Sequence, residues 1–218
     1  MEIGLIVLAI MLASLIGWLL KASIGTQPWV AEGVDEASYQ APFNAGPKAV
    51  ALATLLAVIT SFFALVVSAY SLRMELGDWV PLTEPQMLWT NTVVLILASI
   101  VFQWTRSAAR NGISQRIKPG LLVTGLLTTA FLVGQYVVWQ QLNASGHYVT
   151  SNPADAFFFL VTGLHALHIL GGMYVWARAT KRAFTSSDSV EESTQLCTVY
   201  WHFLLVVWLV LFGLMLST

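Results

Sequence analysis

Three of the four histidines lie within long apolar stretches of the sequence: His165, His168 and His202. His165 and His168 are three residues apart and Gly172 follows His165 by seven, so on a helix the three share one face. Imidazoles at this spacing could bind a metal ion. Polar side chains inside a membrane cost free energy to bury, which makes these histidines functional candidates by default.

Two kinds of role are open to the histidines. A haem held by two axial ligands would need one histidine from each of two helices, and His202 could pair once with His165 or His168, as in a small membrane cytochrome b. No Asp, Glu or Cys in the same apolar core completes a metal site, and the chain has one cysteine, Cys197. The sequence favours a structural role, in which the histidines hydrogen-bond between helices at about 0.6–2 kcal/mol per pair.

Small and uncharged polar residues accompany the histidines inside the apolar stretches. Small residues allow two helix backbones to approach closely in lipid, and amide or hydroxyl side chains can hydrogen-bond across the interface. The acidic residues, in contrast, lie at the ends of the stretches or in loops, unlike those of proton relays. We therefore predict no catalytic, cofactor-binding or metal-binding residue in this chain. The packing residues are Gly163, Ala166, Gly171, Gly172, Asn91, Gln135, Thr162 and Trp201.

Six apolar stretches are long enough to place these residues inside a bilayer, which takes about 20 helical residues. The composition agrees, because 57% of residues are hydrophobic and only 10% are charged, against about 25% charged in soluble domains. The sequence predicts an all-α polytopic membrane bundle. The expected helices are Ile3–Leu20, Val50–Leu72, Met87–Trp104, Leu121–Leu142, Ala156–Ala177 and Leu196–Leu216.

The first stretch, Ile3–Leu20, stands where a signal peptide would. It opens with Met1 and Glu2 instead of basic residues, and its apolar core is longer than the roughly 7–15 residues of a signal peptide. We therefore expect a retained helix. The predicted organisation is an N-terminal helix with its loop over 1–46, followed by a five-helix domain over 47–218.

The positive charges predict how the helices are oriented. If the helices alternate, nine of the ten Lys and Arg residues fall on one side and only Arg73 falls on the other. The positive-inside rule then places both termini outside the cytoplasm. Six tryptophans near predicted span ends suit the headgroup layer: Trp18, Trp79, Trp104, Trp139, Trp176 and Trp201.

Two motifs stand in the last two predicted helices. Residues 157–172 read FFFLVTGLHALHILGG, and residues 199–203 read VYWHF, with VVW at 206–208. Together they resemble the histidine motif and the closing helix of subunit III of haem-copper terminal oxidases. The resemblance covers roughly residues 47–218, the last five predicted helices, and does not reach residues 1–46.

The resemblance implies a non-catalytic subunit of a respiratory complex in a bacterial inner membrane. In that family, subunit III holds no haem or copper, packs on subunit I beside subunit II, and binds phospholipid between its helices. Subunit I carries the haem and copper that reduce oxygen in aerobic electron transport. A related subunit associated with nitric oxide reductase shares the motifs and stays an alternative. Neither the electron donor, cytochrome c or quinol, nor membership of a supercomplex follows from the sequence. The net charge of -1 says nothing about partners, and no nucleic-acid partner is expected.

Three positions depart from the family pattern. The family often has glutamate where this chain has Ile59 and Val138, and aspartate where it has Leu205. Aliphatic side chains cannot take part in proton transfer. Family roles that rest on those carboxylates, such as tuning proton uptake, are therefore not expected here.

Overall fold

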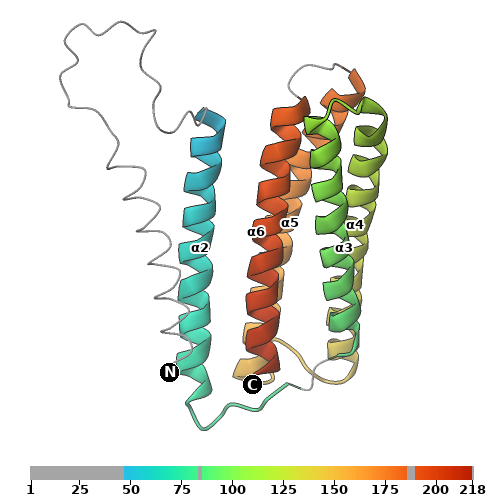
Figure 1. Cartoon of the computed structure of the whole chain (residues 1–218). Coiled ribbons are helices and arrows are strands. Elements are labelled where there is room, and N and C mark those ends of the chain that lie inside the picture. The colour runs from blue at the N-terminus through green and yellow to red at the C-terminus, as the bar shows by residue number, and fades with distance from the viewer. Residues whose placement is uncertain (1–46, 83–84, 186–189, 218) are drawn as a thin grey trace, which may run out of the picture. The chain divides into compact units, whose positions relative to one another are not determined.

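The computed structural model describes residues 47–82, 85–185 and 190–217, and every regular element among them is an α-helix (Figure 1). Helices suit a chain this apolar, because a helix satisfies its backbone hydrogen bonds within one segment and needs no water. The helical prediction is confirmed for five of the six expected spans. The first, Ile3–Leu20, lies outside the described residues.

Five helices of the described residues are long and apolar enough to cross a bilayer. They contain 24 to 33 residues, which at 1.5 Å per residue gives lengths of about 36 to 50 Å. The hydrocarbon layer is about 30 Å thick, so each helix also extends into the headgroup layer. The helices are α2 (Pro47–Met74), α3 (Met87–Arg110), α4 (Ser114–Ala144), α5 (Pro153–Thr185) and α6 (Val190–Leu216).

The chain forms two compact units, Met1–Ser71 and Leu72–Thr218. In the first unit, three hydroxyls of α2 are satisfied within the helix itself. Thr54, Ser61 and Ser71 each donate to the carbonyl oxygen four residues earlier, over 3.0 Å. These bonds remove the cost of carrying hydroxyl groups into lipid.

The second unit contains a bundle of α3, α4, α5 and α6. Helix α3 packs against α4 and α6, and α5 packs against the same two helices, so the four form a closed ring of neighbours. Figure 1 shows the four running side by side, with each helix returning antiparallel to the one before. The short connections explain this arrangement, since three residues separate α3 from α4 and short loops join antiparallel neighbours.

Two glycines with positive φ end α3 and α4. Gly112 has a φ of 68° and Gly146 a φ of 89°, a left-handed conformation that glycine adopts without steric cost. The amide of Ile113 donates to Ala108 O, and the amide of His147 donates to Leu142 O. Both ends therefore form the Schellman motif, which satisfies carbonyls that the helix leaves unpaired.

Glycines also bring α3 and α4 close together inside the bundle. A Cβ atom added at Gly134 would collide with the side chain of Asn91, and one added at Gly120 would collide with Thr105. Close backbone approach of this kind is the usual way in which helices associate in lipid. The two contacts fix the register of α3 against α4.

Candidate functional site

The candidate site is the set of polar side chains inside the bundle, and His202 is one of them. It lies on α6, and its Nδ1 is 2.9 Å from the hydroxyl of Ser99 on α3. The imidazole is half-buried, with its ring directed at the neighbouring helix. His202 therefore takes part in a hydrogen bond between helices.

His165 lies at the centre of the bundle and is fully buried. Its ring centroid is 5.1 Å from that of Trp208 on α6 and 6.0 Å from that of Phe131 on α4. Neither ring nitrogen has a hydrogen-bond partner among the described residues. The imidazole thus packs between aromatic rings of two helices, and its predicted interhelical hydrogen bond stays a prediction.

His168 is three residues further along α5 and has different surroundings. Its Nδ1 donates to Leu164 O of its own helix over 2.7 Å, and its backbone carbonyl accepts the Tyr200 hydroxyl of α6 over 3.0 Å. The Tyr200 ring lies over Gly172, where an added Cβ would come within 2.6 Å of it. Gly172 is thus the point at which α6 approaches the α5 backbone.

Three tryptophans form indole-to-hydroxyl hydrogen bonds with threonines on neighbouring helices. Each threonine hydroxyl accepts the indole N–H and donates in turn to the carbonyl four residues earlier in its own helix, over 2.7–2.8 Å. The bonds therefore join two helices while leaving no hydroxyl unsatisfied. The pairs are Trp208–Thr92 at 3.0 Å, Trp201–Thr128 at 3.1 Å and Trp139–Thr162 at 3.1 Å.

Trp201, which the sequence analysis placed near the end of a span, is buried inside the bundle, and its place in the headgroup layer stays a prediction. Its side chain is 3% exposed, and its ring centroid lies 5.1 Å from that of Phe102 on α3. Helix α6 begins at Val190, six residues before the apolar stretch starts at Leu196. Trp201 is a core residue.

The two amide residues of the prediction, Asn91 and Gln135, are each 2% exposed. Asn91 on α3 faces Gly134 of α4. The Nδ2 atom of Asn91 and both amide atoms of Gln135 have no hydrogen-bond partner among the described residues. Gly163, in comparison, meets only the edge of Trp139 at ordinary contact distance.

A haem or metal site was the rival interpretation of the histidines. The structure directs them to different partners, since His202 bonds to α3, His168 bonds to its own helix, and His165 packs between α4 and α6. Across residues 47–82, 85–185 and 190–217, no group of three His, Cys, Asp or Glu side chains gathers in a metal-binding arrangement.

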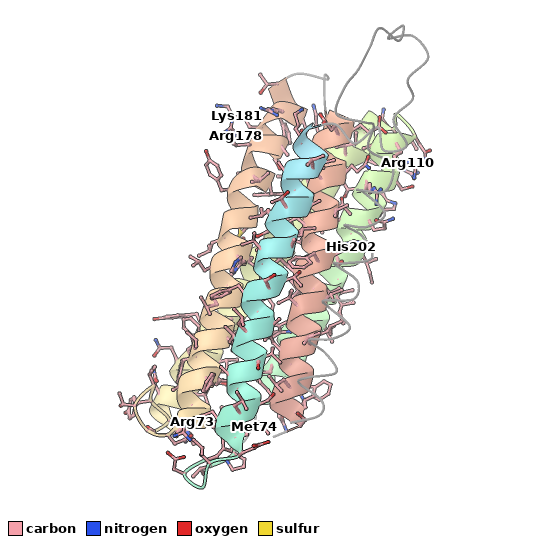
Figure 2. All side chains as sticks on the ribbon, turned by 90° about the vertical axis from the view of Figure 1, so that its left-hand side faces the viewer. Arg73, Met74, Arg110, Arg178, Lys181 and His202 are labelled. Carbon is pink, nitrogen blue, oxygen red and sulfur yellow. The ribbon has the colours of Figure 1, made fainter. Side chains whose placement is uncertain are left out.

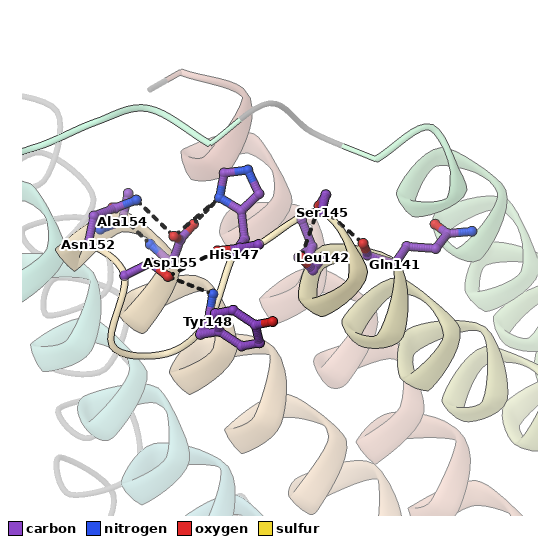
Figure 3. A network of polar contacts seen from close by, with 10 residues as sticks. Gln141, Leu142, Ser145, His147, Tyr148, Asn152, Ala154 and Asp155 are labelled. Atoms are coloured by element: carbon purple, nitrogen blue, oxygen red, sulfur yellow. Dashed lines mark hydrogen bonds and ion pairs between the residues drawn. The ribbon is translucent and has the colours of Figure 1, made fainter.

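A polar network that the sequence analysis missed joins the end of α4 to the start of α5 (Figure 3). The Asp155 side chain is fully buried and accepts hydrogen bonds from His147 Nδ1 at 3.2 Å and Asn152 Nδ2 at 2.8 Å. Asn152 caps α5 by accepting the amide of Ala154 at 2.7 Å. The sequence contains a pattern that could have revealed the network, because residues 152–155 read Asn-Pro-Ala-Asp, a common start of a helix.

Basic side chains lie at opposite ends of the second unit in unequal numbers. Figure 2 shows Arg110, Arg178 and Lys181 at one end and Arg73 at the other. Arg73 forms an exposed ion pair with Asp78. The Arg73 guanidinium, by hydrogen bonding, holds the pKa of the Asp78 carboxyl below its usual value.

Comparisons with known proteins identify a family and several relatives of this chain. The family model for cytochrome c oxidase subunit III matches residues 2–217, so the match includes the N-terminal segment that the two motifs did not reach. A probable cytochrome c oxidase subunit 3 of Mycobacterium tuberculosis is 30% identical over 158 residues, 69% of this chain and 78% of the relative. The cytochrome c oxidase subunit 3 of Corynebacterium diphtheriae is 34% identical over 125 residues, 56% and 60% of the two chains. That of a Synechocystis species is 26% identical over 165 residues, 72% and 70%.

Proposed function

Since the chain belongs to the cytochrome c oxidase subunit III family, we propose that it is a non-catalytic subunit that packs on subunit I of a respiratory haem-copper oxidase. The haem and copper that reduce oxygen belong to subunit I in this proposal. The present chain contributes a helical bundle that contacts the catalytic subunit and binds phospholipid.

The observation that carries the proposal is the use of the bundle's polar groups. His202, Trp201 and Trp208 each hydrogen-bond to a residue of another helix. Side chains engaged in this way hold neighbouring helices together. The family match supports the proposal that the bundle works within a respiratory oxidase.

The outward faces of the bundle support contact with lipid or another membrane subunit. On α5, Leu160, Leu167, Leu170 and Tyr174 are between 47% and 65% exposed. In water, an apolar surface of this kind would be unstable, whereas lipid tails or a partner's transmembrane helices match it. We propose that part of this apolar surface faces subunit I and that the remainder faces phospholipid.

The proposal omits a role in proton transfer through buried carboxylates. Val138 on α4, which stands where related chains often have glutamate, is fully buried. An aliphatic side chain there can pack but cannot exchange a proton. We also propose a bacterial inner membrane with the end that holds Arg110, Arg178 and Lys181 in the cytoplasm, as the positive-inside rule suggests.

Purification from the native membrane tests the proposal. A tagged chain should retain a large haem-containing subunit with oxygen-reducing activity, and the chain alone, after separation, should show no stoichiometric Soret band. An untagged membrane carried through the same steps controls for nonspecific recovery. Recovery with nitric oxide reductase subunits, recovery without any haem subunit, or a Soret band in the isolated chain would each refute it.

A further inference from the structure

Three buried side chains inside the bundle, those of Asn91, Gln135 and His165, together carry five polar atoms that have no partner among the described residues. These atoms are Nδ2 of Asn91, both amide atoms of Gln135 and both ring nitrogens of His165. The side chains are 2%, 2% and 0% exposed. Buried polar groups nearly always have a partner, so a cluster of unpaired ones points to a ligand.

Gln135 and His165 lie at the same depth on the facing sides of α4 and α5. The hydrogen bond from Trp139 to Thr162 fixes the register of the two antiparallel helices. Gln135 is four residues before Trp139 and His165 is three residues after Thr162, so both are one turn from the bond in the same direction. The Phe131–His165 ring contact, one turn further along α4, agrees with this register.

Contacts with α3 and α6 complete the ring at this depth. Gly134, the neighbour of Gln135, lies against the side chain of Asn91. The ring of His165 lies against Trp208, whose indole donates to Thr92, the neighbour of Asn91. All four helices of the bundle thus meet in one layer that contains the five unpaired atoms. We call Asn91, Gln135 and His165 the polar layer.

The chemistry of the polar layer limits what can bind there. Asn91 and Gln135 carry no charge, and the layer includes no carboxylate that would attract a cation. Phe131 and Val138 are fully buried one turn to either side of Gln135 on the same face of α4, which separates the layer from solvent along that helix. A suitable ligand is small, neutral and able both to donate and to accept hydrogen bonds.

We propose that the polar layer binds ordered water molecules that bridge Gln135, His165 and Asn91 across three helices. A buried water makes about three hydrogen bonds, and these side chains offer amide donors, an amide acceptor and one donor and one acceptor of a neutral imidazole. Such water is part of the folded bundle and exchanges slowly with bulk solvent.

Hydroxyl-radical footprinting of the full chain, isolated from its native membrane with its accompanying subunits, tests this proposal. Short X-ray pulses produce radicals from water in place, so a buried side chain beside bound water is oxidised and a dry one is not. We expect His165 to be labelled several-fold faster than Phe102, which is equally buried but packs against Trp201. Gln135→Met should reduce the labelling of His165 towards that of Phe102.

A high-resolution map of the unmodified assembly gives a second measurement that needs no variant. Water density within hydrogen-bond distance of Gln135 and His165 is the expected result. Labelling of His165 no faster than that of Phe102, a direct Gln135–His165 hydrogen bond, or density with the short bonds of a metal ion would overturn the proposal.

Discussion

Trp208 of α6 donates its indole N–H to the hydroxyl of Thr92 on α3 over 3.0 Å, while its ring lies against His165 of α5. One fully buried side chain therefore contacts two neighbouring helices at once. A donor at this position is shielded from bulk water, so removal of its acceptor is not compensated from outside the bundle. The stability of the bundle should depend on this bond more than on hydroxyls that serve a single helix.

Replacing Thr92 with valine tests that dependence. The change keeps the shape of the side chain and leaves the Trp208 N–H unpaired, which should cost about 1–2 kcal/mol. Thermal release of the chain from its complex should occur at a lower temperature. Thr129→Val is the control, because the Thr129 hydroxyl donates to Gly125 O of its own helix. An equal fall in the release temperature of the two variants would contradict the expectation.

The Ser99–His202 bond should be measurable as a coupling between α3 and α6. Ser99→Ala and His202→Leu should each lower the thermal stability of the assembly, and the double variant should lose less than the sum. The expected coupling is about 0.6–1.7 kcal/mol. Ser107→Ala, on the exposed face of α3, should show no coupling with His202→Leu. If the stability losses of the two single variants simply add in the double variant, the Ser99–His202 bond contributes nothing to the stability of the assembly.

His165→Leu and His168→Leu should weaken association of the helices without ending oxygen reduction by the complex. Oxygen reduction should persist because the contacts of both histidines are with other residues of this chain: His165 packs between rings, and His168 bonds to its own helix. Retained turnover per assembled complex, with a lower yield of assembly, is the expected result. Complete loss of activity in an intact complex would assign the histidines a chemical role.

Gly125→Ala should destabilise the bundle where Gly171→Ala does not. A Cβ at Gly125 would overlap the indole ring of Trp176, which cannot move without losing its 3.1 Å bond to Leu121 O. Overpacking of this kind costs about 1–3 kcal/mol. Gly171 has nothing within 4 Å of an added Cβ, and alanine there should be neutral or slightly stabilising. Thermal unfolding of the two variants side by side makes the comparison.

Asp155→Ala should loosen the start of α5 and lower the unfolding temperature of the complex. It leaves the donors of His147 and Asn152 without their buried acceptor, at a cost of about 1–3 kcal/mol. Asp78→Asn, which breaks an exposed ion pair, should have a much smaller effect. Because the Asp78 pKa is lowered, its small contribution is fully present above the ordinary carboxyl pKa and is lost as the pH falls through the lowered pKa.

The sequence predicted the five described helices, but most of the predicted helices were several residues shorter than the observed ones. The stretch Ala156–Ala177 became Pro153–Thr185, and Leu121–Leu142 became Ser114–Ala144. Hydropathy marks where the chain leaves lipid, whereas the backbone hydrogen bonds continue through charged residues until a cap or glycine stops them. The ends were therefore set by Gly112, Gly146 and Asn152.

Side-chain partners were harder to predict than helices. In a lipid-exposed bundle the outer face is as apolar as the inner one, so periodicity does not reveal which way Trp201 or His168 points. The sequence singled out His202 and Gln135 as polar groups in apolar stretches. It could not show that His202 hydrogen-bonds to Ser99 whereas Gln135 has no hydrogen-bond partner among the described residues.

The threonines that accept tryptophan N–H groups have a consequence for biogenesis. Thr92, Thr128 and Thr162 each donate to a carbonyl of their own helix, so a newly synthesised span can enter the bilayer singly with no stranded hydroxyl. Each hydroxyl still has a lone pair to offer when the neighbouring span arrives. Insertion of the helices and their later association can thus be separate steps, with the indoles completing bonds that insertion did not require.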